Sequence, residues 1–313
     1  MSTLAVESPG LLTTVQDLGR PGFGATGVSP SGAADPVSLR LGNLLVGNEP
    51  GAAGLEMTLV GGSFMFPEGA VIALTGANFA ATIEGYPAQN WTVHAVPPEG
   101  NLKFGATQDF ARSYLAIAGG VQVPLVVGSA STHLLSGLGG CGGRALRRGD
   151  VLKIGKPEQN LPARKIAESV LSNLQPSTIF RVTDGPQGDL FPETAKQAFF
   201  SSAFRVTEEC DRTGLRLEGP EVKCDLSGAM ITEGVPLGAI QVTPSGQPII
   251  LFVEQQTTGG YPKIANVIGV DLHRLGQLRP RLEIRFERTS LAIARALWIK
   301  QERLLNSPRR LFA

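Results

Sequence analysis

The sequence predicts a mainly β protein of two domains, with a few short helices and a C-terminal helix. Three observations lead to this fold class. The 313 residues include 39 glycines and 22 prolines, which indicates frequent turns between short elements. The apolar runs are short and often alternate with polar residues, as in strands. The chain also exceeds the size of one ordinary core, and its length suits two domains of roughly 150 residues each.

The predicted domains cover residues 1–160 and 176–313. Between them, residues 156–176 form the most polar stretch of the chain, KPEQNLPARKIAESVLSNLQP, which suits a linker. A short helix over 163–171 interrupts this linker.

In the first domain, residues 13–32 are predicted to form a long, ordered, glycine-rich loop. Asp35 and Pro36 then favour a helix start, because aspartate caps the first amides and proline suits the first turn. An apolar stripe continues that helix until Gly47 and Asn48 end it. Strands are expected at 55–66 (a hairpin), 71–86, 91–96, 113–127 (two short strands and a turn) and 151–154.

In the second domain, the same patterns predict strands and short helices in alternation. The closing segment, 290–306, has apolar residues on one side and charged residues on the other, which favours a helix. Strands are expected at 178–183, 204–208, within 210–219 after a charged turn, and at 249–253, 266–270 and 282–286; short helices are expected at 192–201 and 271–278.

Composition excludes several classes of protein. Hydrophobic residues make up 42% and charged residues 18%, which indicates a soluble globular protein. A net charge of +1 gives no reason to expect a nucleic-acid or membrane surface. No apolar run approaches the roughly 20 residues that cross a bilayer, and the N-terminus lacks a signal sequence, so a cytoplasmic location is expected.

Several familiar sites are not expected. Three widely spaced cysteines and three histidines predict neither a disulfide framework nor a metal site. The segment 137–142 fits the GxGxxG spacing but leads to Arg144 and another turn instead of a helix, so we interpret it as a flexible or anion-holding loop. There is no GxxxxGK[ST] motif, and no lysine lies between methionines, so this chain is not expected to carry biotin.

The stretch from Ser245 to Ile264 is the most informative one for function. A buried strand at 249–253 is followed by five uncharged or acidic polar residues, then by Gly259, Gly260, Tyr261, Pro262 and Lys263. Glycines allow the backbone to approach a neighbour closely, and the surrounding donors and acceptors suit a small polar ligand. A binding loop and a simple polar hairpin loop both fit this pattern.

A series of motifs resembles one known family. They are Thr14–Arg20 (TVQDLGR), Ser31–Asp35 (SGAAD), Asn43–Asn48 (NLLVGN), Leu55–Thr58 (LEMT), Tyr114–Gly120 (YLAIAGG), Asp211–Leu217 (DRTGLRL), Ser245–Pro248 (SGQP) and Gln256–Pro262 (QTTGGYP). Together they resemble the family of allophanate hydrolase subunit 2, also called the C subunit of 5-oxoprolinase, from about Leu12 to Phe286.

This resemblance implies two cyclophilin-like β-barrel domains, as in the carboxyltransferase domain of urea carboxylase. It implies a direct complex with the B subunit of 5-oxoprolinase, a further A subunit, and an ATP-dependent opening of 5-oxo-L-proline to L-glutamate. Two alternatives remain open: a biotin-dependent carboxyltransferase component, and a regulatory protein that binds its partner without turnover. Either this chain or the B subunit holds ATP and any Mg²⁺, and the substrate site lies between the barrels or is shared with the partner.

That chemistry suggests roles for polar residues. Phosphorylation of a lactam oxygen needs donors for phosphate, and a carboxylate to accept a proton. The candidate catalytic residues are Asp17, Arg20, Asp211, Arg212 and Lys263; the candidate substrate contacts are Glu56, Gln241, Ser245, Gln247, Gln256, Thr257, Thr258 and Tyr261; and the candidate cofactor contacts are Gly259, Gly260 and Arg144.

Most of these candidates also have a structural interpretation. Asp35 suits a helix cap, and Arg20 suits a bridge between loop carbonyls. Asp211 and Arg212 suit an ion pair within a turn, and Glu56 is either solvated or in a barrel mouth. Lys263 suits a solvated loop charge. Tyr261 suits the packing of a turn.

Overall fold

The computed structural model describes residues 2–156, 163–175, 177–225 and 230–313. By their contacts these residues form two compact units. The first unit takes the described residues within Met1–Arg20, Ser31–Gln175 and Ser307–Ala313; the second takes those within Pro21–Pro30 and Pro176–Asn306. The C-terminal segment joins the first unit through a bridge between Phe312 and Ile166.

The domain limits 1–160 and 176–313, and the linker 156–176, remain predictions. Within that linker, residues 157–162 and 176 lie outside the described residues. The helix expected at 163–171 is confined to α2, Glu168–Leu171.

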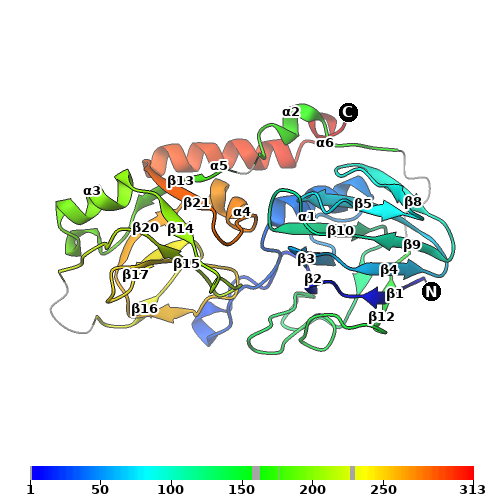
Figure 1. The fold of residues 1–313 in the computed structure, drawn as a ribbon, viewed down its shortest axis with the longest axis horizontal. Helices are drawn as coiled ribbons and strands as arrows, with labels where there is room; N and C mark the ends of the chain where they lie inside the picture. Colours follow the sequence, from blue (N-terminus) through cyan, green and yellow to red (C-terminus); the bar gives the residue numbers. More distant parts are fainter. Residues whose placement is uncertain (1, 157–162, 176, 226–229) are drawn as a thin grey trace. The chain divides into compact units, whose positions relative to one another are not determined.

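The structure is mainly β, which confirms the predicted fold class (Figure 1). In the first unit the strands form two antiparallel sheets, with the orders β11-β12-β1-β4-β9-β6-β7 and β2-β3-β10-β5-β8. The strands are β1 Thr3–Ser8, β2 Leu12–Gln16, β3 Gly54–Thr58, β4 Ser63–Phe66, β5 Ala70–Gly76, β6 Thr82–Ile83, β7 Tyr86–Pro87, β8 Val93–Val96, β9 Gly100–Lys103, β10 Arg112–Ile117, β11 Val121–Gln122 and β12 Val151–Ile154.

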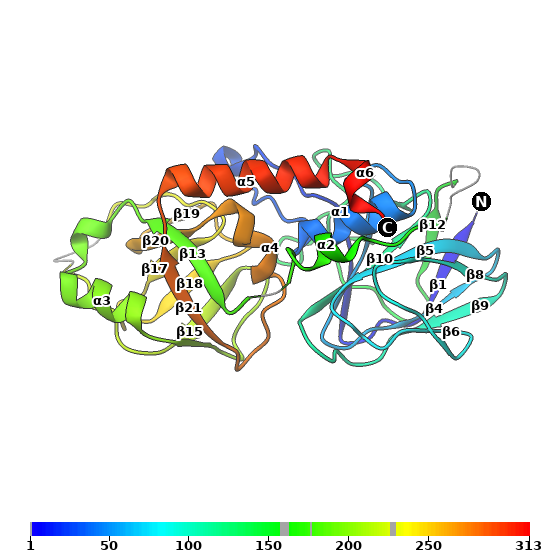
Figure 2. The ribbon, with the colours of Figure 1, turned by 90° about the horizontal axis from the view of Figure 1, so that it is seen from above.

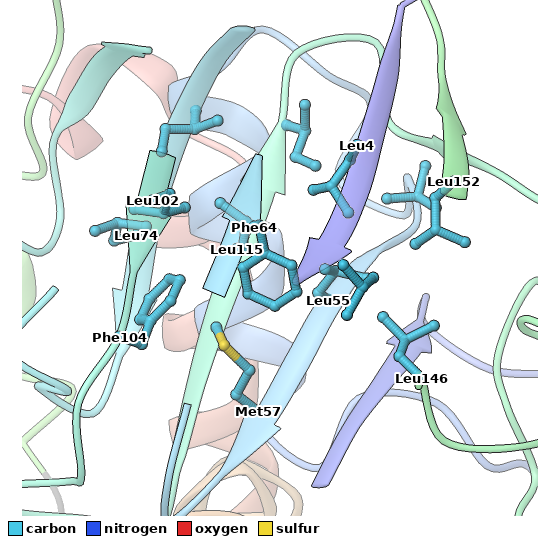
Figure 3. Close-up of a cluster of buried hydrophobic side chains, with 14 of the residues drawn as sticks. Leu4, Leu55, Met57, Phe64, Leu74, Leu102, Phe104, Leu115, Leu146 and Leu152 are labelled. Carbon is cyan, nitrogen blue, oxygen red and sulfur yellow. The ribbon is translucent and has the colours of Figure 1, made fainter. Parts of the chain in front are cut away.

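Both sheets of the first unit contribute to one hydrophobic core (Figure 3). Leu55 and Leu115 come from the sheet that contains β3 and β10, whereas Leu4, Phe64 and Leu102 come from the other sheet; all five are fully buried. Burial of each such side chain contributes about 1.5–3 kcal/mol relative to exposure. The alternation of apolar residues along these strands therefore holds the two sheets together.

A buried polar network holds the start of α1, Pro36–Leu45, against β3 and β10. The Tyr114 hydroxyl donates to Glu56 Oε2 (2.7 Å) and accepts from the Asp35 amide (2.7 Å). Glu56 Oε2 also accepts from the Ala34 amide (2.7 Å), and its other oxygen lies 3.5 Å from Arg112 Nε. Asp35 caps α1 by accepting from the Ser38 amide, as predicted. Glu56 is 2% exposed, so its interpretation as a solvated side chain is wrong.

The second unit contains a closed barrel with the strand order β13-β20-β17-β18-β15-β14-β21. Only the β13–β21 pair is parallel among the barrel pairings of the described residues. A separate two-stranded ribbon pairs β16 with β19. The strands are β13 Ile179–Asp184, β14 Phe204–Val206, β15 Gly214–Glu218, β16 Glu233–Gly234, β17 Ala239–Val242, β18 Pro248–Leu251, β19 Thr258–Gly259, β20 Lys263–Val267 and β21 Glu283–Arg288.

Aromatic packing attaches α3, Glu193–Ser201, to the barrel beside β21 (Figure 2). The rings of Phe199 and Phe286 stack with centroids 4.6 Å apart, and Phe204 lies against both. The remaining helices are α4 Leu272–Leu275, α5 Leu291–Leu305 and α6 Pro308–Leu311, with 3₁₀ helices at Gly24–Thr26, Gly188–Leu190 and Gly269–Asp271.

The C-terminal helix predicted at 290–306 is confirmed as α5, which Ser290 caps by accepting from the Ile293 amide. Its predicted apolar side is less buried than expected. Leu305 is buried, whereas Leu291 is 77% exposed and Trp298 52% exposed. No helix in the described ranges is long and apolar enough to span a bilayer.

Three local predictions are wrong. Residues 55–66 are not a hairpin, because β3 pairs with β2 and β10 while β4 pairs with β1 and β9. Residues 13–16 belong to a buried strand, β2, instead of a loop. The strand expected at 266–270 begins earlier, at Lys263. In each case the partner strand is distant in sequence, so local pattern did not reveal the pairing.

We expect Tyr114→Phe to lower the free energy of unfolding by about 1–3 kcal/mol, because it removes the donor to a buried carboxylate and the acceptor for a buried amide. Burial, followed by the nearby charges of Glu56 and Asp35, raises the pKa of Tyr114 well above its ordinary value. Unfolded tyrosine ionises near pH 10, so the wild-type protein loses this stabilisation as the pH rises above about 10.

Urea unfolding at several pH values tests both effects. The variant should show a weaker loss of stability above pH 10 than the wild type. Tyr86→Phe is the matched control, since Tyr86 is 77% exposed. Equal effects of the two substitutions would contradict the network.

Candidate functional site in the second unit

Strand register places three side chains in a row on the outer face of the barrel. Gln241 on β17 pairs with Ile249 on β18, which pairs with Arg216 on β15. Directly paired residues of antiparallel strands project to the same face. The neighbouring row, in which Ile250 pairs with Ile240 and Leu215, is buried in the core. The row of Gln241, Ile249 and Arg216 therefore faces away from the core.

A pocket of about 460 Å³ lies over this row. That volume is within the usual range for small-molecule sites. Four predicted site residues line it: Asp211, Gln241, Gln256 and Tyr261. The other lining residues are Glu209, Thr213, Gly214, Arg216, Thr243, Ile249 and Leu251. Its wall thus combines neutral amides, hydroxyls, two carboxylates and one guanidinium with aliphatic side chains.

The loop that follows β18 approaches Gln241 closely. Gln256 Nε2 donates to Gln241 Oε1 (3.3 Å), and Gln241 Nε2 donates to the Tyr261 carbonyl (3.4 Å). A Cβ on Gly259 would lie 2.5 Å from Gln241 Nε2. The predicted close approach of a glycine backbone is therefore present at Gly259, and the neighbour it meets is the Gln241 side chain. Gly260 has more room, with nothing closer than 3.5 Å to such a Cβ.

A second pocket of about 650 Å³ adjoins the first. The two share Glu209, Arg216, Thr243 and Ile249. Two predicted substrate contacts line only the second pocket, namely Ser245 and Gln247. Gln247 exchanges hydrogen bonds with the backbone of Gly219, at 3.1 and 3.3 Å. Ser245 bonds to the Thr243 hydroxyl. These hydrogen bonds stabilise the turn beside the two pockets.

Two predicted catalytic cations of the second unit form internal ion pairs. Arg212 Nε lies 2.5 Å from Glu254 Oε1, and both side chains are buried. The predicted turn pair of Asp211 with Arg212 is therefore wrong. Lys263 lies on β20 with 1% of its side chain exposed and contacts Glu233 (2.5 Å), so its interpretation as a solvated loop charge is also wrong. Its hydrogen bond lowers the pKa of Glu233, with a further contribution from Gln187.

Asp211 stabilises its own turn at the edge of the pocket. One oxygen, Oδ1, accepts from the Thr213 amide (2.7 Å), the Thr213 hydroxyl (2.5 Å) and the Gly214 amide (3.1 Å). Of the threonines in the glycine loop, Thr258 is exposed on β19, and the Thr257 carbonyl accepts from the Val235 amide. No catalytic role for these residues follows from the contacts alone, and those roles remain predictions.

Asp17 and Arg20 lie in the first unit and bind its loops. Asp17 accepts from the hydroxyls of Ser129 (2.7 Å) and Ser131 (2.5 Å), and from the amides of Gly19 and Ala130. The Arg20 guanidinium is buried and donates to the carbonyls of Ser131 and Val126. These contacts confirm the interpretation of Arg20 as a bridge between loop carbonyls.

Arg144, a predicted cofactor contact, also lies in the first unit. Its guanidinium forms a two-bond contact with Asp150, at 2.7 and 2.8 Å. This pairing lowers the pKa of Asp150. The preceding segment 137–142 leads to no helix, as predicted. The free thiol of Cys141 has a raised pKa because of burial, which disfavours the reactive thiolate.

Sequence reasoning missed Arg216, Thr213 and Glu209 as pocket residues. Arg216 lies within the motif Asp211–Leu217, five residues after Asp211, and its side chain reaches the pocket because it alternates with core residues on β15. Strand alternation from Leu215 and Leu217 was the signal that could have found it. Among the described residues, no cluster of three or more histidine, cysteine or carboxylate side chains is suited to hold a metal ion.

Residues 26–288 match the family model for the carboxyltransferase domain, subdomain A and B. This chain belongs to that carboxyltransferase-domain family. The C subunit of 5-oxoprolinase from Escherichia coli (strain K12) is 38% identical over 291 residues, which are 92% of each chain. The protein of the same name from Haemophilus influenzae is 33% identical over 95% of each chain. These similarities confirm the resemblance drawn from the motifs.

Longer members of the carboxyltransferase-domain family contain this fold as one part. The urea amidolyase of Saccharomyces cerevisiae is 34% identical over 98% of this chain but only 18% of its own length. The crystal structure of the Kluyveromyces lactis urea amidolyase superimposes with a TM-score of 0.92 at 33% identity, and covers 98% of this chain and 20% of that one. The fold thus occurs both in chains of about this length and as about a fifth of much longer chains.

The proposed phosphate contacts of this family member fit ATP poorly. Arg144, Arg212 and Lys263 each pair with a carboxylate, and Arg20 donates to backbone carbonyls. A phosphate would have to displace these partners, and separation of the buried pair of Arg212 and Glu254 would leave an uncompensated charge. We therefore derive no catalytic step through these four side chains.

We expect Gly259→Ala to displace the Gln241 amide, because the added methyl group would lie 2.5 Å from Nε2. The free energy of unfolding should fall by about 1–3 kcal/mol, since Gln241 is buried and its hydrogen-bonded amide would have to move. The amide NMR signals of Gln241 should shift. Gly260→Ala is the matched control and should leave these signals in place; equal shifts in both variants would contradict the close approach.

We expect Arg212→Met to lower the free energy of unfolding by about 3–5 kcal/mol, because the buried Glu254 carboxylate would lose the guanidinium that contacts its Oε1. The double variant Arg212→Met, Glu254→Met should be more stable than the single one. Urea unfolding measures both.

The control is Arg205→Met, which removes the exposed pair with Glu218 and should leave stability almost unchanged. If Arg212→Met changes the free energy of unfolding no more than the control does, the pair of Arg212 and Glu254 does not stabilise the fold.

Proposed function

We propose that this protein is the C subunit of an ATP-dependent 5-oxoprolinase, which acts with the A and B subunits to open 5-oxo-L-proline to L-glutamate. The observation that carries the proposal is the polar pocket of the second unit in a chain that is 38% identical, over 92% of each, to a 5-oxoprolinase C subunit. Activity is proposed for the complex rather than for this chain alone. Because ATP is an intracellular substrate, we place the complex in the cytoplasm.

The pocket suits a small lactam. A five-membered lactam presents one N–H donor and one carbonyl acceptor, and the exposed side-chain amide of Gln256 offers both complementary groups, with the buried Gln241 amide hydrogen-bonded to it. Its methylene groups can pack on Ile249 and Leu251 in the pocket wall. Gly259 and the Tyr261 carbonyl hold the Gln241 amide in place before substrate binds, which reduces the ordering cost of binding.

ATP supplies phosphorylation of the lactam oxygen, which converts a resonance-stabilised amide into an activated group. Since the cationic candidates of this chain are engaged in internal contacts, we propose that the B subunit holds the phosphates and any Mg²⁺. The residues of this chain then bind and orient the lactam. Asp211, with one oxygen engaged in its turn, is the pocket carboxylate proposed to accept a proton.

A biotin-dependent carboxyltransferase is a second candidate, supported by the 34% identity to urea amidolyase over 98% of this chain. It would use the same scaffold and would take carboxylate from biotin carried on another polypeptide. Avidin blotting of the native complex distinguishes the two candidates. A biotinylated partner that co-purifies with this chain would favour the carboxyltransferase.

The decisive experiment is reconstitution with the A and B subunits. We expect glutamate release from 5-oxo-L-proline to require ATP and all three polypeptides. The control omits this chain, and circular dichroism verifies that the added chain is folded. If folded protein gives no stimulation over the A and B subunits, the proposal is rejected and a regulatory binding role is favoured.

A further inference from the structure

Arg216 is the one cationic side chain among the described residues that line the 460 Å³ pocket. The remaining charges there belong to Glu209 and Asp211. An anionic ligand would meet net repulsion from these two carboxylates unless Arg216 opposes them. Any anionic group of a ligand in this pocket is therefore expected next to Arg216.

The position of Arg216 in the row suits a ligand that has an amide at one end and a carboxylate at the other. Arg216 and Gln241 lie on the two strands that flank β18, with Ile249 between them. Adjacent strands are about 4.7–4.9 Å apart, so the backbones of Arg216 and Gln241 are separated by roughly 9–10 Å. A small ring over Ile249 can present an amide to the hydrogen-bonded pair of Gln241 and Gln256, and a carboxylate to Arg216.

The pairing of Arg216 is looser than that of neighbouring arginines. Its Nε lies 3.8 Å from Glu209 Oε2, and the two side chains are 54% and 82% exposed. By contrast, Arg205 contacts Glu218 at 2.7 Å and Arg281 contacts Glu208 at 2.8 Å. An exposed pair at the longer distance contributes little stability, so a ligand carboxylate can replace Glu209 at small cost.

We propose that Arg216 is a specificity-determining residue that binds the substrate carboxylate and releases Glu209 when it does so. The substrate class is then a small cyclic amide that carries a carboxylate, as opposed to a neutral amide. A guanidinium binds a carboxylate through two parallel hydrogen bonds, which gives both energy and orientation. This inference rests on the proposed function. It adds the residue that favours a carboxylate-bearing lactam over a neutral one.

The test uses Arg216→Gln in the reconstituted complex of three polypeptides. Loss of a charge-assisted contact should raise KM for 5-oxo-L-proline by about 10- to 100-fold, with kcat changed by less than about 3-fold. Glu209→Gln removes the competing carboxylate and should lower KM by about 2- to 5-fold. Arg205→Gln is the matched control, since its pair with Glu218 lines only the neighbouring pocket, and it should leave KM unchanged.

A binding measurement gives a readout independent of turnover. Isotope-labelled wild-type chain, titrated with 5-oxo-L-proline and with 2-pyrrolidinone, should bind the acid more tightly than the lactam without a carboxylate. In Arg216→Gln the two affinities should become similar. Arg216→Lys, which keeps the charge but not the paired donors, should lie between wild type and glutamine.

The outcomes separate the inference from the function. If the wild-type complex is active and Arg216→Gln leaves KM unchanged, the inference is overturned while the function stands. If the wild-type complex releases no glutamate, the function itself fails. Should Arg216→Gln not fold, an unchanged KM in both Arg216→Lys and Glu209→Gln overturns the inference.

Discussion

The register between β17, β18 and β15 is the constraint on which the candidate site depends. Each pairing is fixed by the buried row of Ile240, Ile250 and Leu215, because a slip of one residue would move this row out of the core. The outward row is therefore determined as well. Core packing thus sets which polar side chains meet on the outer face.

Internal charge pairing shapes the chemistry left for a ligand. The pairs of Arg212 with Glu254 and of Lys263 with Glu233 hold segments around the β18 loop, and neither cation is open to an anion without the loss of its partner. What remains on the pocket wall is a set of amides and hydroxyls, together with the carboxylates of Glu209 and Asp211 and one cation, Arg216. With two carboxylates and a single cation, such a wall suits a small amide that carries one carboxylate better than it suits a nucleoside triphosphate, which agrees with the proposal that the B subunit holds the phosphates.

Local sequence pattern predicted much of the fold and part of the site. The capped start of α1, the helix α5, the two short strands β10 and β11 and the strand β12 all follow from nearby residues. Four predicted site residues do meet at one pocket. The hairpin expected over residues 55–66 is wrong because β3 and β4 belong to different sheets. The residues of these two strands do not by themselves indicate which partner strand each one pairs with.

The sequence by itself determined that the chain is mainly β, that the paired Gly259 and Gly260 allow a close backbone approach in a polar loop, and, through its motifs, the family. Only the tertiary structure decided which charged side chains are engaged in internal contacts and which are accessible to a ligand. Asp17, Arg20 and Lys263 bear polar groups suited to catalysis, yet their contacts are with Ser129 and Ser131, with loop carbonyls and with Glu233. The physical reason is that a buried charge must be matched by a partner, and the partners come from segments far away along the chain.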